Sequence, residues 1–391
     1  MLVVIGCFPS IGFATGQFAG IGDLAGGANS SIAESISSDG AVVVGVSSAS
    51  SGSQGIIFTP TAGIQPIGLS VSAQAVSADG TTVVGGVFVE ANNAIEPFIF
   101  TAEEGLNLLG VPPGETTVGT TIAQGVSADG SVVVGSTFFG GEFQAFRWTE
   151  GSGFESLQSD LPGNSQSSLA SDISDDGTVI VGGLLGPSGR AFLWTDAAGG
   201  IDLGGLPGGD ESSLAIAVSA NGTAVVGTSS SANSDSEAFL WTANTGIIGL
   251  GVLSNADSIT TPFAVTGSGE AVVGQSNIFE DSLSEDAFLW TEENGLELLQ
   301  DVLEERFDLE DELAGWTLTS ARDISSDGRF ITGVGINPLG DIEGWVVSLN
   351  EPIFNSLVVP EPSTLVITSS LLLLIICLNR KTHTCIGSQT K

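Results

Sequence analysis

The stretch Leu169-Ala-Ser-Asp-Ile-Ser-Asp-Asp-Gly-Thr-Val-Ile-Val-Gly182 contains the pattern that decides the fold. Two short β-prone runs flank Ser174-Asp-Asp-Gly177, and Asp and Gly tolerate the left-handed backbone that a tight hairpin turn needs. Ala191–Thr195 follows with alternating side chains, which place its two aromatics on one face. After a second turn the chain continues into Ile201–Leu206. This unit therefore predicts four strands in about 45 residues, the size of one propeller blade.

The same unit occurs seven times. The turn glycines lie 40 to 59 residues apart: Gly40, Gly80, Gly130, Gly177, Gly222, Gly269 and Gly328. An aromatic in the later run keeps the same period: Phe58, Phe100, Trp148, Trp194, Trp241, Trp290 and Trp345. Two independent markers with one period predict a repeat architecture, either a propeller or a solenoid.

The two ends of the array favour a closed ring. The last unit stops at Leu349 without its fourth strand, whereas Phe18–Leu24 near the N-terminus matches Ile201–Leu206 and has no unit of its own. If the N-terminal strand completes the last blade, no sheet edge is left exposed. The fold class predicted is all-β: a seven-bladed β-propeller closed by an N-terminal strand, plus a C-terminal transmembrane sorting helix. Six or eight blades, or an open solenoid with capped ends, are the alternatives.

One segment breaks the repeat. Leu298–Leu313 has apolar residues at helical spacing with acidic residues between them. We expect an amphipathic helix that lies on the propeller, with a partner-binding helix as the alternative.

The composition restricts the partners. The formal net charge is −37, and both lysines, Lys381 and Lys391, lie at the C-terminal end. Such a surface repels nucleic acid and anionic lipid headgroups, so we expect no nucleic-acid partner. Acidity can serve solubility alone, or divalent cations can be its natural counterpart.

The residue inventory argues against most catalytic chemistry. All three cysteines, Cys7, Cys377 and Cys385, lie outside the repeats, which also contain no His, Lys or Tyr. General-base, Schiff-base and zinc chemistry depend on these residues. A glycosidase needs two carboxylates across a cleft, and no motif singles out such a pair. We therefore expect no enzyme and no catalytic residue.

The repeated turns and aromatics each have two interpretations. Carboxylates suit Ca²⁺, and the turn with Asp175 and Asp176 offers two, which makes these residues candidates for a weak Ca²⁺ site; no other cofactor is expected. The alternative is that Asp175 and Asp176 serve only to stabilise the hairpin turn. The aromatics, such as Phe192 and Trp194, could stack on sugars, but their recurrence in every unit favours the core between blades.

The repeats resemble the HAF family of extracellular repeats. The family pattern, an (H)AF-x-W run with Asp-Leu-Gly and Val-Val-Gly strands, is matched by Glu237–Trp241, Asp286–Trp290, Asp202–Gly204 and Val225–Gly227. Acidic residues, Glu237 and Asp286, stand where the family has its histidine. The resemblance covers about residues 18–349 and implies an extracellular repeat protein, with little information on activity.

The N-terminal residues 1–14 are apolar and end in Gly12-Phe-Ala14, a small-x-small cleavage site without a preceding basic region. We expect a truncated signal peptide. The alternatives are a lipoprotein box ending at Cys7 and a plain apolar terminus.

The C-terminal segment 359–391 resembles the PEP-CTERM sorting signal of Gram-negative envelope proteins. Its motif is Val359, Pro360, Glu361, Pro362, Ser363 and Thr364; the apolar run Leu365–Leu378 and the basic Arg380 and Lys381 follow. Basic residues favour the cytoplasmic side of a membrane helix. The resemblance implies recognition by an exosortase-type enzyme, with the membrane helix as an intermediate before release to the cell surface.

Together these features predict a signal-like segment (1–14), a propeller (15–350), a linker (351–358) and a sorting signal (359–391). The function expected is that of an exported, acidic structural or binding module of the envelope or of the exopolysaccharide matrix. A glycan-binding lectin is the alternative, and an extracellular hydrolase is the weaker one.

Overall fold

The computed structural model describes residues 16–110, 120–139, 141–162, 167–186, 189–232, 234–253, 258–278 and 285–355. In chain order the strands are β1 (Gln17–Gly20), β2 (Gly26–Ile36), β3 (Val43–Ala49), β4 (Gly52–Thr59), β5 (Gly63–Leu69), β6 (Val71–Val76), β7 (Thr82–Val89), β8 (Ala94–Thr101), β9 (Gly105–Leu108), β10 (Thr121–Val126), β11 (Val132–Phe139), β12 (Glu142–Thr149), β13 (Gly153–Ser156) and β14 (Ser167–Ile173). They continue with β15 (Val179–Leu185), β16 (Arg190–Thr195), β17 (Gly199–Gly204), β18 (Ser213–Val218), β19 (Ala224–Ser229), β20 (Glu237–Thr242), β21 (Gly246–Gly251), β22 (Ser258–Val265), β23 (Ala271–Ile278), β24 (Glu285–Thr291), β25 (Gly295–Leu298), β26 (Thr317–Ile324), β27 (Phe330–Ile336) and β28 (Ile342–Ser348). The helices are α1 (Leu299–Phe307) and the 3₁₀ turns η1 (Gln158–Asp160) and η2 (Ile353–Asn355).

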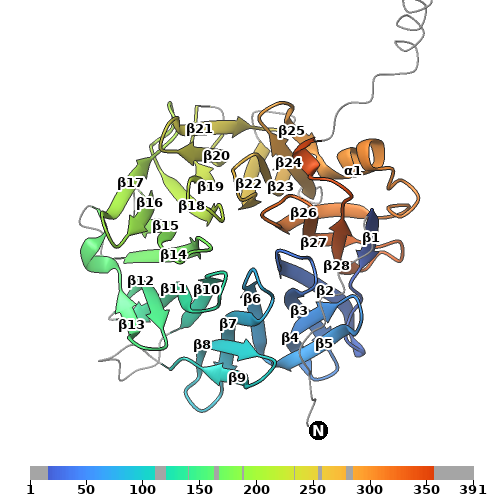
Figure 1. The fold of residues 1–391 in the computed structure, drawn as a ribbon, viewed down its shortest axis with the longest axis horizontal. Coiled ribbons are helices and arrows are strands. Elements are labelled where there is room, and N and C mark those ends of the chain that lie inside the picture. The colour runs from blue at the N-terminus through green and yellow to red at the C-terminus, as the bar shows by residue number, and fades with distance from the viewer. Residues whose placement is uncertain are drawn as a thin grey trace, which may run out of the picture. The chain divides into compact units, whose positions relative to one another are not determined.

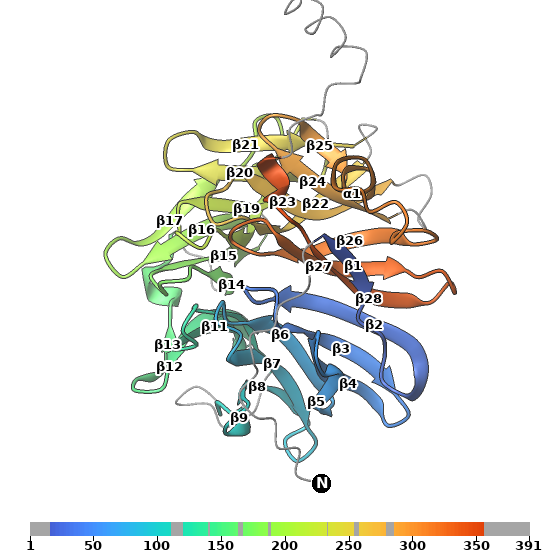
Figure 2. The same ribbon diagram turned by 45° about the vertical axis from the view of Figure 1, so that its right-hand side comes forward.

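The described strands form seven four-stranded antiparallel blades arranged in a ring (Figures 1 and 2). Blades 1 to 6 are β2–β5, β6–β9, β10–β13, β14–β17, β18–β21 and β22–β25, and blade 7 contains β26, β27 and β28. In each blade the first strand lies nearest the centre of the ring (Figure 1). The prediction of a β-propeller built from one repeat per blade is confirmed.

The N-terminal strand closes the ring as predicted. Strand β1 pairs antiparallel with β28, with Phe18 opposite Val347 and Gly20 opposite Trp345, and so becomes the fourth strand of blade 7. The Glu343 carboxylate accepts a hydrogen bond from the backbone N–H of Gly22 at 2.9 Å, which fixes the chain just after β1. Glu237 of blade 5 accepts an N–H from Gly251 of its own fourth strand at 3.2 Å. The acidic residue two positions before the buried aromatic, Phe239 or Trp345, therefore anchors the outer strand in both blades.

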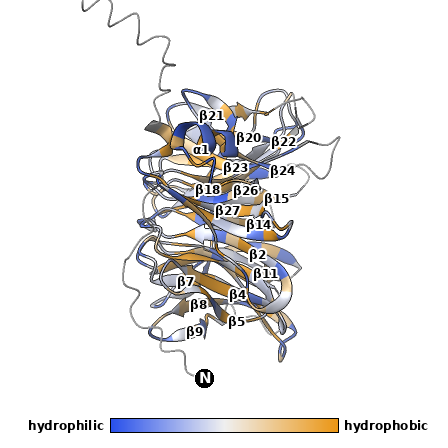
Figure 3. Ribbon diagram, turned by 90° about the vertical axis from the view of Figure 1, so that its right-hand side faces the viewer, coloured by the Kyte–Doolittle hydropathy of each residue, from blue (hydrophilic) through white to orange (hydrophobic). Residues whose placement is uncertain are grey.

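Seven clusters of buried apolar side chains fill the seven interfaces between blades. Phe192 and Trp194 of blade 4 are 0% and 4% exposed and pack with Val134 and Ala145 of blade 3. The interpretation of the repeated aromatics as interblade core is confirmed. Figure 3 shows hydrophobic stretches running along the stacked strands.

Strand register corrects one of the repeat markers. In blade 4, Gly182 lies opposite Phe192 and Ile180 lies opposite Trp194. In blade 7, Trp345 lies opposite Gly333, which is the place of Phe192 and not of Trp194. In blade 7 the sequence marker was therefore two residues out of register, because Trp345 occupies the first of the two aromatic positions and not the second.

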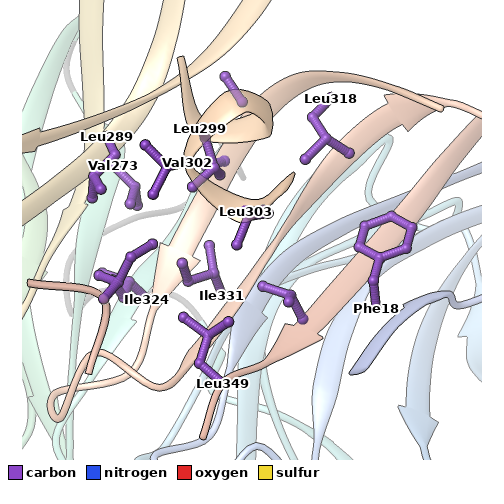
Figure 4. Close-up of a cluster of buried hydrophobic side chains, with 14 of the residues drawn as sticks. Phe18, Val273, Leu289, Leu299, Val302, Leu303, Leu318, Ile324, Ile331 and Leu349 are labelled. Atoms are coloured by element: carbon purple, nitrogen blue, oxygen red, sulfur yellow. The ribbon is translucent and has the colours of Figure 1, made fainter. Parts of the chain in front are cut away.

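The helix predicted over 298–313 is shorter than expected. α1 ends at Phe307, because Asp308 takes a left-handed conformation with φ of 56°. Its apolar face still packs on the propeller: Leu299, Val302 and Leu303 point toward Leu318 and Ile331, as Figure 4 shows. The prediction that this segment lies on the propeller is confirmed.

The predicted C-terminal membrane helix is corrected. α1, with nine residues, spans only about 14 Å, against a hydrocarbon core of about 30 Å. No helix within the described ranges is long and apolar enough to cross a bilayer, and the predicted span Leu365–Leu378 lies outside those ranges. The fold class is therefore an all-β propeller with α1 as its single described α-helix. Its compact unit extends to Phe354, since Ile353 is buried in the core of blade 7.

The innermost strand of every blade contains a β-bulge, and this bulge explains the Val-Val-Gly motif. In blade 4 the register shifts between Ala170 and Asp172, which leaves Ser171 unpaired. A Cβ at Gly182 would lie 1.9 Å from the carbonyl oxygen of Leu169. Glycine at position 182 therefore allows β15 to pack closely on β14.

We predict that Gly182→Ala destabilises the propeller by about 2–4 kcal/mol, because the added methyl group forces β14 and β15 apart. Gly151→Ala is the matched control, since no atom lies within 4 Å of a Cβ built there. Equilibrium urea unfolding checks both variants. Equal midpoints would contradict the role assigned to the close contact.

A second prediction concerns closure. Phe18→Ala should lower the free energy of unfolding by about 3 kcal/mol, because the ring is 8% exposed and lies 5.1 Å from Trp316 between ring centroids. Phe88→Ala, at a position 41% exposed, should have little effect. Thermal unfolding of the two variants tests this prediction. Equal losses of stability in Phe18→Ala and Phe88→Ala would mean that β1 does not hold the ring closed.

Candidate functional site

The seven innermost strands line an open cavity of about 220 Å³ at the axis of the ring. Its wall contains the unpaired bulge residue of each blade in turn: Glu34, Gln74, Gln124, Ser171, Ile216, Phe263 and Arg322. A bulge re-aims the side chain of its extra residue. The fold therefore directs one side chain per blade to a common point.

The composition of this ring differs from that of the rest of the repeat. The turns and the Val-Val-Gly strands carry nearly the same residues in every blade, because the same backbone must form seven times. The bulge position carries a cation, an acid, two amides, a hydroxyl and two apolar side chains. Backbone geometry does not require this variety, so the wall of the cavity is chemically asymmetric for a reason other than folding.

Arg322 is the cation of the ring. Its guanidinium carbon lies 4.5 Å from the centroid of the Phe263 ring, a cation–π contact with the adjacent blade. Among the described residues, Arg147, Arg190, Arg306 and Arg329 each have a carboxylate within 4.0 Å. Arg322 makes no such ion pair, and its Nε is buried without a hydrogen-bond acceptor.

Glu34 lies on blade 1, next to blade 7, and the positive charge of Arg322 affects its pKa. Burial raises the pKa of Glu34 above its usual range, and the positive charge of Arg322 partly offsets that effect. The two side chains are not in ion-pair contact within the described structure.

Two other carboxyls in the cavity wall join adjacent blades. Asp172 of blade 4 accepts N–H groups from Ile173 at 2.7 Å and from Val218 of blade 5 at 2.9 Å. Asp323 of blade 7 accepts N–H groups from Ile324 and from Ile36 of blade 1, at 2.8 and 2.9 Å.

The same position holds Ser35 in blade 1. Its hydroxyl donates to Asp323 at 2.9 Å and accepts the N–H of Val76 in blade 2 at 3.3 Å. Asp323 and Ser35 thus connect three successive blades across the point where the ring closes. Blades 2, 3, 5 and 6 have Ala75, Gly125, Ala217 and Ala264 there and carry no such link.

Burial is the main cause of the shifted pKa values of the two aspartates. It raises the pKa of Asp172 to about 7 and that of Asp323 to about 6, although the N–H donors favour the charged form. The negative charge of Asp323 adds to the effect on Asp172.

The Ca²⁺ candidates Asp175 and Asp176 lie in the first turn of blade 4. Asp176 Oδ1 accepts hydrogen bonds from the Ser174 hydroxyl at 2.7 Å and from the N–H and hydroxyl of Thr178. The neighbouring Asp175 lines the cavity. Within the described ranges no group of three or more His, Cys, Asp or Glu side chains is arranged to hold a metal ion. Weak Ca²⁺ binding at this turn stays a prediction.

The turns also link the blades to one another. The N–H of Asp175 donates to the carbonyl of Ala220 in blade 5, and the carbonyl of Asp175 accepts from Ala128 in blade 3, both at 3.0 Å. Equivalent bonds join Ser38 to Ala78 and Gly267 to Ser326. The repeated motif therefore shapes each hairpin and at the same time forms a hydrogen-bonded belt around the cavity.

The sorting motif Val359–Thr364, the basic residues Arg380 and Lys381 and the leader 1–14 lie outside the described residues. Conversely, sequence reasoning missed the bulge ring. A signal was present, because each ring residue stands three positions before the first residue of the turn motif, as Ser171 stands before Ser174.

Comparison with known proteins supports the fold and nothing finer. No protein-family model and no curated protein matches the chain. Among solved structures, an oligogalacturonate lyase in complex with manganese has a TM-score of 0.53 at 12% identity, covering 88% of this chain and 100% of that one.

The β-propeller domain of the Trilobed protease from Pyrococcus furiosus has a TM-score of 0.52 at 10% identity, covering 82% of this chain and 96% of that one. That domain is described as having an open velcro topology, whereas β1 closes the ring here. TolB from Acinetobacter baumannii has a TM-score of 0.45 at 12% identity over 68% of this chain; the chain covers 62% of that protein's length. The two likenesses with TM-scores above 0.5, at 10% and 12% identity, show a shared β-propeller fold.

We predict that Asp172 makes the stability of the ring depend on pH. Its pKa of about 7 in the folded state lies above the ordinary value of 3.8, so the folded protein binds more protons than the unfolded chain between these values. The resulting stabilisation is complete below about pH 3.8 and is lost as the pH rises through 7. From pH 5 to 8 the melting temperature of the wild type should therefore fall more than that of Asp172→Asn.

Asp176→Asn is the control for this experiment. Hydrogen bonds from Thr178 and Ser174 lower the pKa of Asp176, so it does not titrate between pH 5 and 8. This variant should keep the slope of the wild type. A slope in Asp172→Asn equal to that of the wild type would contradict the prediction.

Proposed function

We propose that the protein is an exported binding module of the cell envelope, and that it holds a small polar ligand in the central cavity. The observation that carries this proposal is the bulge ring, in which seven equivalent positions present different side chains to one central cavity. A module with only a structural role would need the repeated residues and would gain nothing from an arginine without a counter-ion.

The sequence supports the export part of the proposal. The repeats contain no cysteine, the surface is strongly acidic, and the Pro360-Glu-Pro362 motif resembles a sorting signal read by an exosortase-type enzyme. The likeness of the repeats to the extracellular HAF class points the same way. The envelope or its exopolysaccharide matrix is the proposed location.

The site supports binding without catalysis. Of the carboxyls in the wall, Asp172 and Asp323 use both oxygens to accept backbone N–H groups. They are therefore positioned to join blades and not to transfer protons to a substrate. Arg322, Glu34 and Asp175 are the other charged side chains of the wall, and the wall offers no His, Cys, Lys or Tyr among the described residues.

A second candidate function is glycan binding through the loops. Phe138 and Phe143 form an edge-to-face pair at the end of the β11–β12 hairpin, 5.1 Å apart between ring centroids, and are 39% and 36% exposed. Exposed aromatic rings of this kind stack on sugars. A glycan array tests this alternative, and loss of a signal in Phe143→Ala would support it.

The main proposal is tested by blocking the cavity. Ser171→Trp should fill it, and the ring already accepts Phe263 and Arg322 at equivalent positions, so folding should persist. Protein purified from the envelope fraction of its host should carry a small molecule detectable by native mass spectrometry, and the variant should not.

Ser152→Trp, in an exposed turn of blade 3, is the control and should retain the molecule. Recovery of the protein only from the cytoplasm would contradict its location. The absence of any bound molecule from both wild type and blocked variant would contradict the binding role.

A further inference from the structure

We infer that the ligand of the central cavity is a small zwitterion that carries both a carboxylate and an ammonium group, as an amino acid does. The inference rests on the proposed binding function and goes further, because it specifies the chemistry of the ligand. Its basis is the placement of Arg322, Glu34, Phe263 and Ile216 around one space.

Arg322 is the group in the wall that best suits a negatively charged partner. A buried N–H group without an acceptor costs roughly 1–3 kcal/mol, and more for a charged group. The Phe263 ring attracts the guanidinium through its π face but accepts no N–H in the way that an oxygen does. A carboxylate matches the forked donors of a guanidinium and would satisfy both the charge and the free Nε.

Glu34 requires the opposite partner. It lies in the wall one blade away from Arg322, close enough to feel that charge but not paired with it within the described structure. A ligand ammonium group beside Glu34 would complete the pairing. One molecule with both charges would thus satisfy two side chains that do not satisfy each other.

One part of the remaining wall is apolar. Ile216 and Phe263 occupy adjacent blades, 5 and 6, and add an apolar surface beside Arg322, whereas Gln74, Gln124 and Ser171 make the rest of the ring polar. The cavity of about 220 Å³ has room for a molecule of amino-acid size. An aliphatic side chain of the ligand would contact the apolar part of the wall.

Three other ligand classes fit less well. A simple anion would enter against the formal net charge of −37, whereas a zwitterion carries no net charge. A divalent cation would meet four carboxyls in the wall, of which Asp172 and Asp323 already accept backbone N–H groups, and no three of the described His, Cys, Asp or Glu side chains are arranged to hold a metal ion. A neutral sugar would leave the charge of Arg322 without a counter-ion.

The test is isothermal titration of the full chain with glycine, L-leucine and L-phenylalanine. We expect L-leucine to bind, and its two single-charge analogues, 4-methylpentanoate and leucinamide, to bind much more weakly. Arg322→Gln should weaken L-leucine binding by about 10- to 100-fold, since hydrogen bonds to charged groups contribute about that much. Glu34→Gln should weaken it as well.

Arg329→Gln is the matched control, because Arg329 is exposed and lies 3.7 Å from its partner Asp327. It should leave the affinity unchanged. Circular dichroism confirms folding of each variant, and Arg322→Lys, which keeps the charge but not the fork, should bind better than Arg322→Gln.

Failure of all three amino acids to bind, or leucinamide binding as tightly as L-leucine, would overturn the inference. So would binding that Arg322→Gln leaves unchanged. If the envelope protein still carries a molecule that Ser171→Trp loses, only the assignment of a zwitterion fails and the binding function stands.

Discussion

The close contact between the Val-Val-Gly glycine and the carbonyl of the innermost strand is the constraint on which the rest of the structure depends. In six blades besides blade 4, a Cβ at this glycine would also lie within about 2 Å of a backbone oxygen, as at Gly45 against Ile32 and at Gly333 against Ser320. The contact exists because the first strand bulges at that point. The same bulge directs one side chain per blade to the cavity. A single backbone irregularity, repeated seven times, therefore produces both the tight packing of each blade and the ring of residues that line the cavity.

The ring is closed by contacts between its first and last blades. Each blade is joined to the next by the chain itself, except that β26, β27 and β28 of blade 7, the last strands in the sequence, meet blade 1 only through non-covalent contacts. Strand β1 completes blade 7, and its Phe18 packs with Trp316 and Trp345 in the core between blades 6 and 7. At the junction of blades 7 and 1, Ile21 packs with Ile36 and Val346, and hydrogen bonds from Ser35 and Ile36 to Asp323 join the two blades. Burying a carboxyl is unfavourable unless it is well paired. At Asp323 three donors compensate for the burial: the Ser35 hydroxyl and the N–H groups of Ile36 and Ile324.

Much of this fold could be predicted from the sequence because its signals are local. The turn of Ser174 to Gly177, the aromatic run at Phe192 and the unpaired strand at Phe18 each follow from residues a few positions apart. The end of α1 could not be predicted in this way, since Asp308 adopts a left-handed conformation and Leu309 and Leu313 continue to pack without a helix. The place of Trp345 was misassigned for a related reason: an aromatic fits either of two buried positions, and only strand register separates them.

The candidate site was not predicted from the sequence, because its residues differ from one repeat to the next. A search for repeats finds what is the same in each unit, and the ring consists of what differs. Glu34 and Arg322 are 288 positions apart and belong to blades that meet only because the chain closes on itself. Their proximity is a property of the ring and of no segment within it. In a repeat protein the constant positions thus describe the scaffold, and the position that varies while its backbone stays constant indicates the function. Here that position is three residues before each turn, where the only described arginine without a carboxylate partner lies beside an aromatic ring at the axis of an acidic protein.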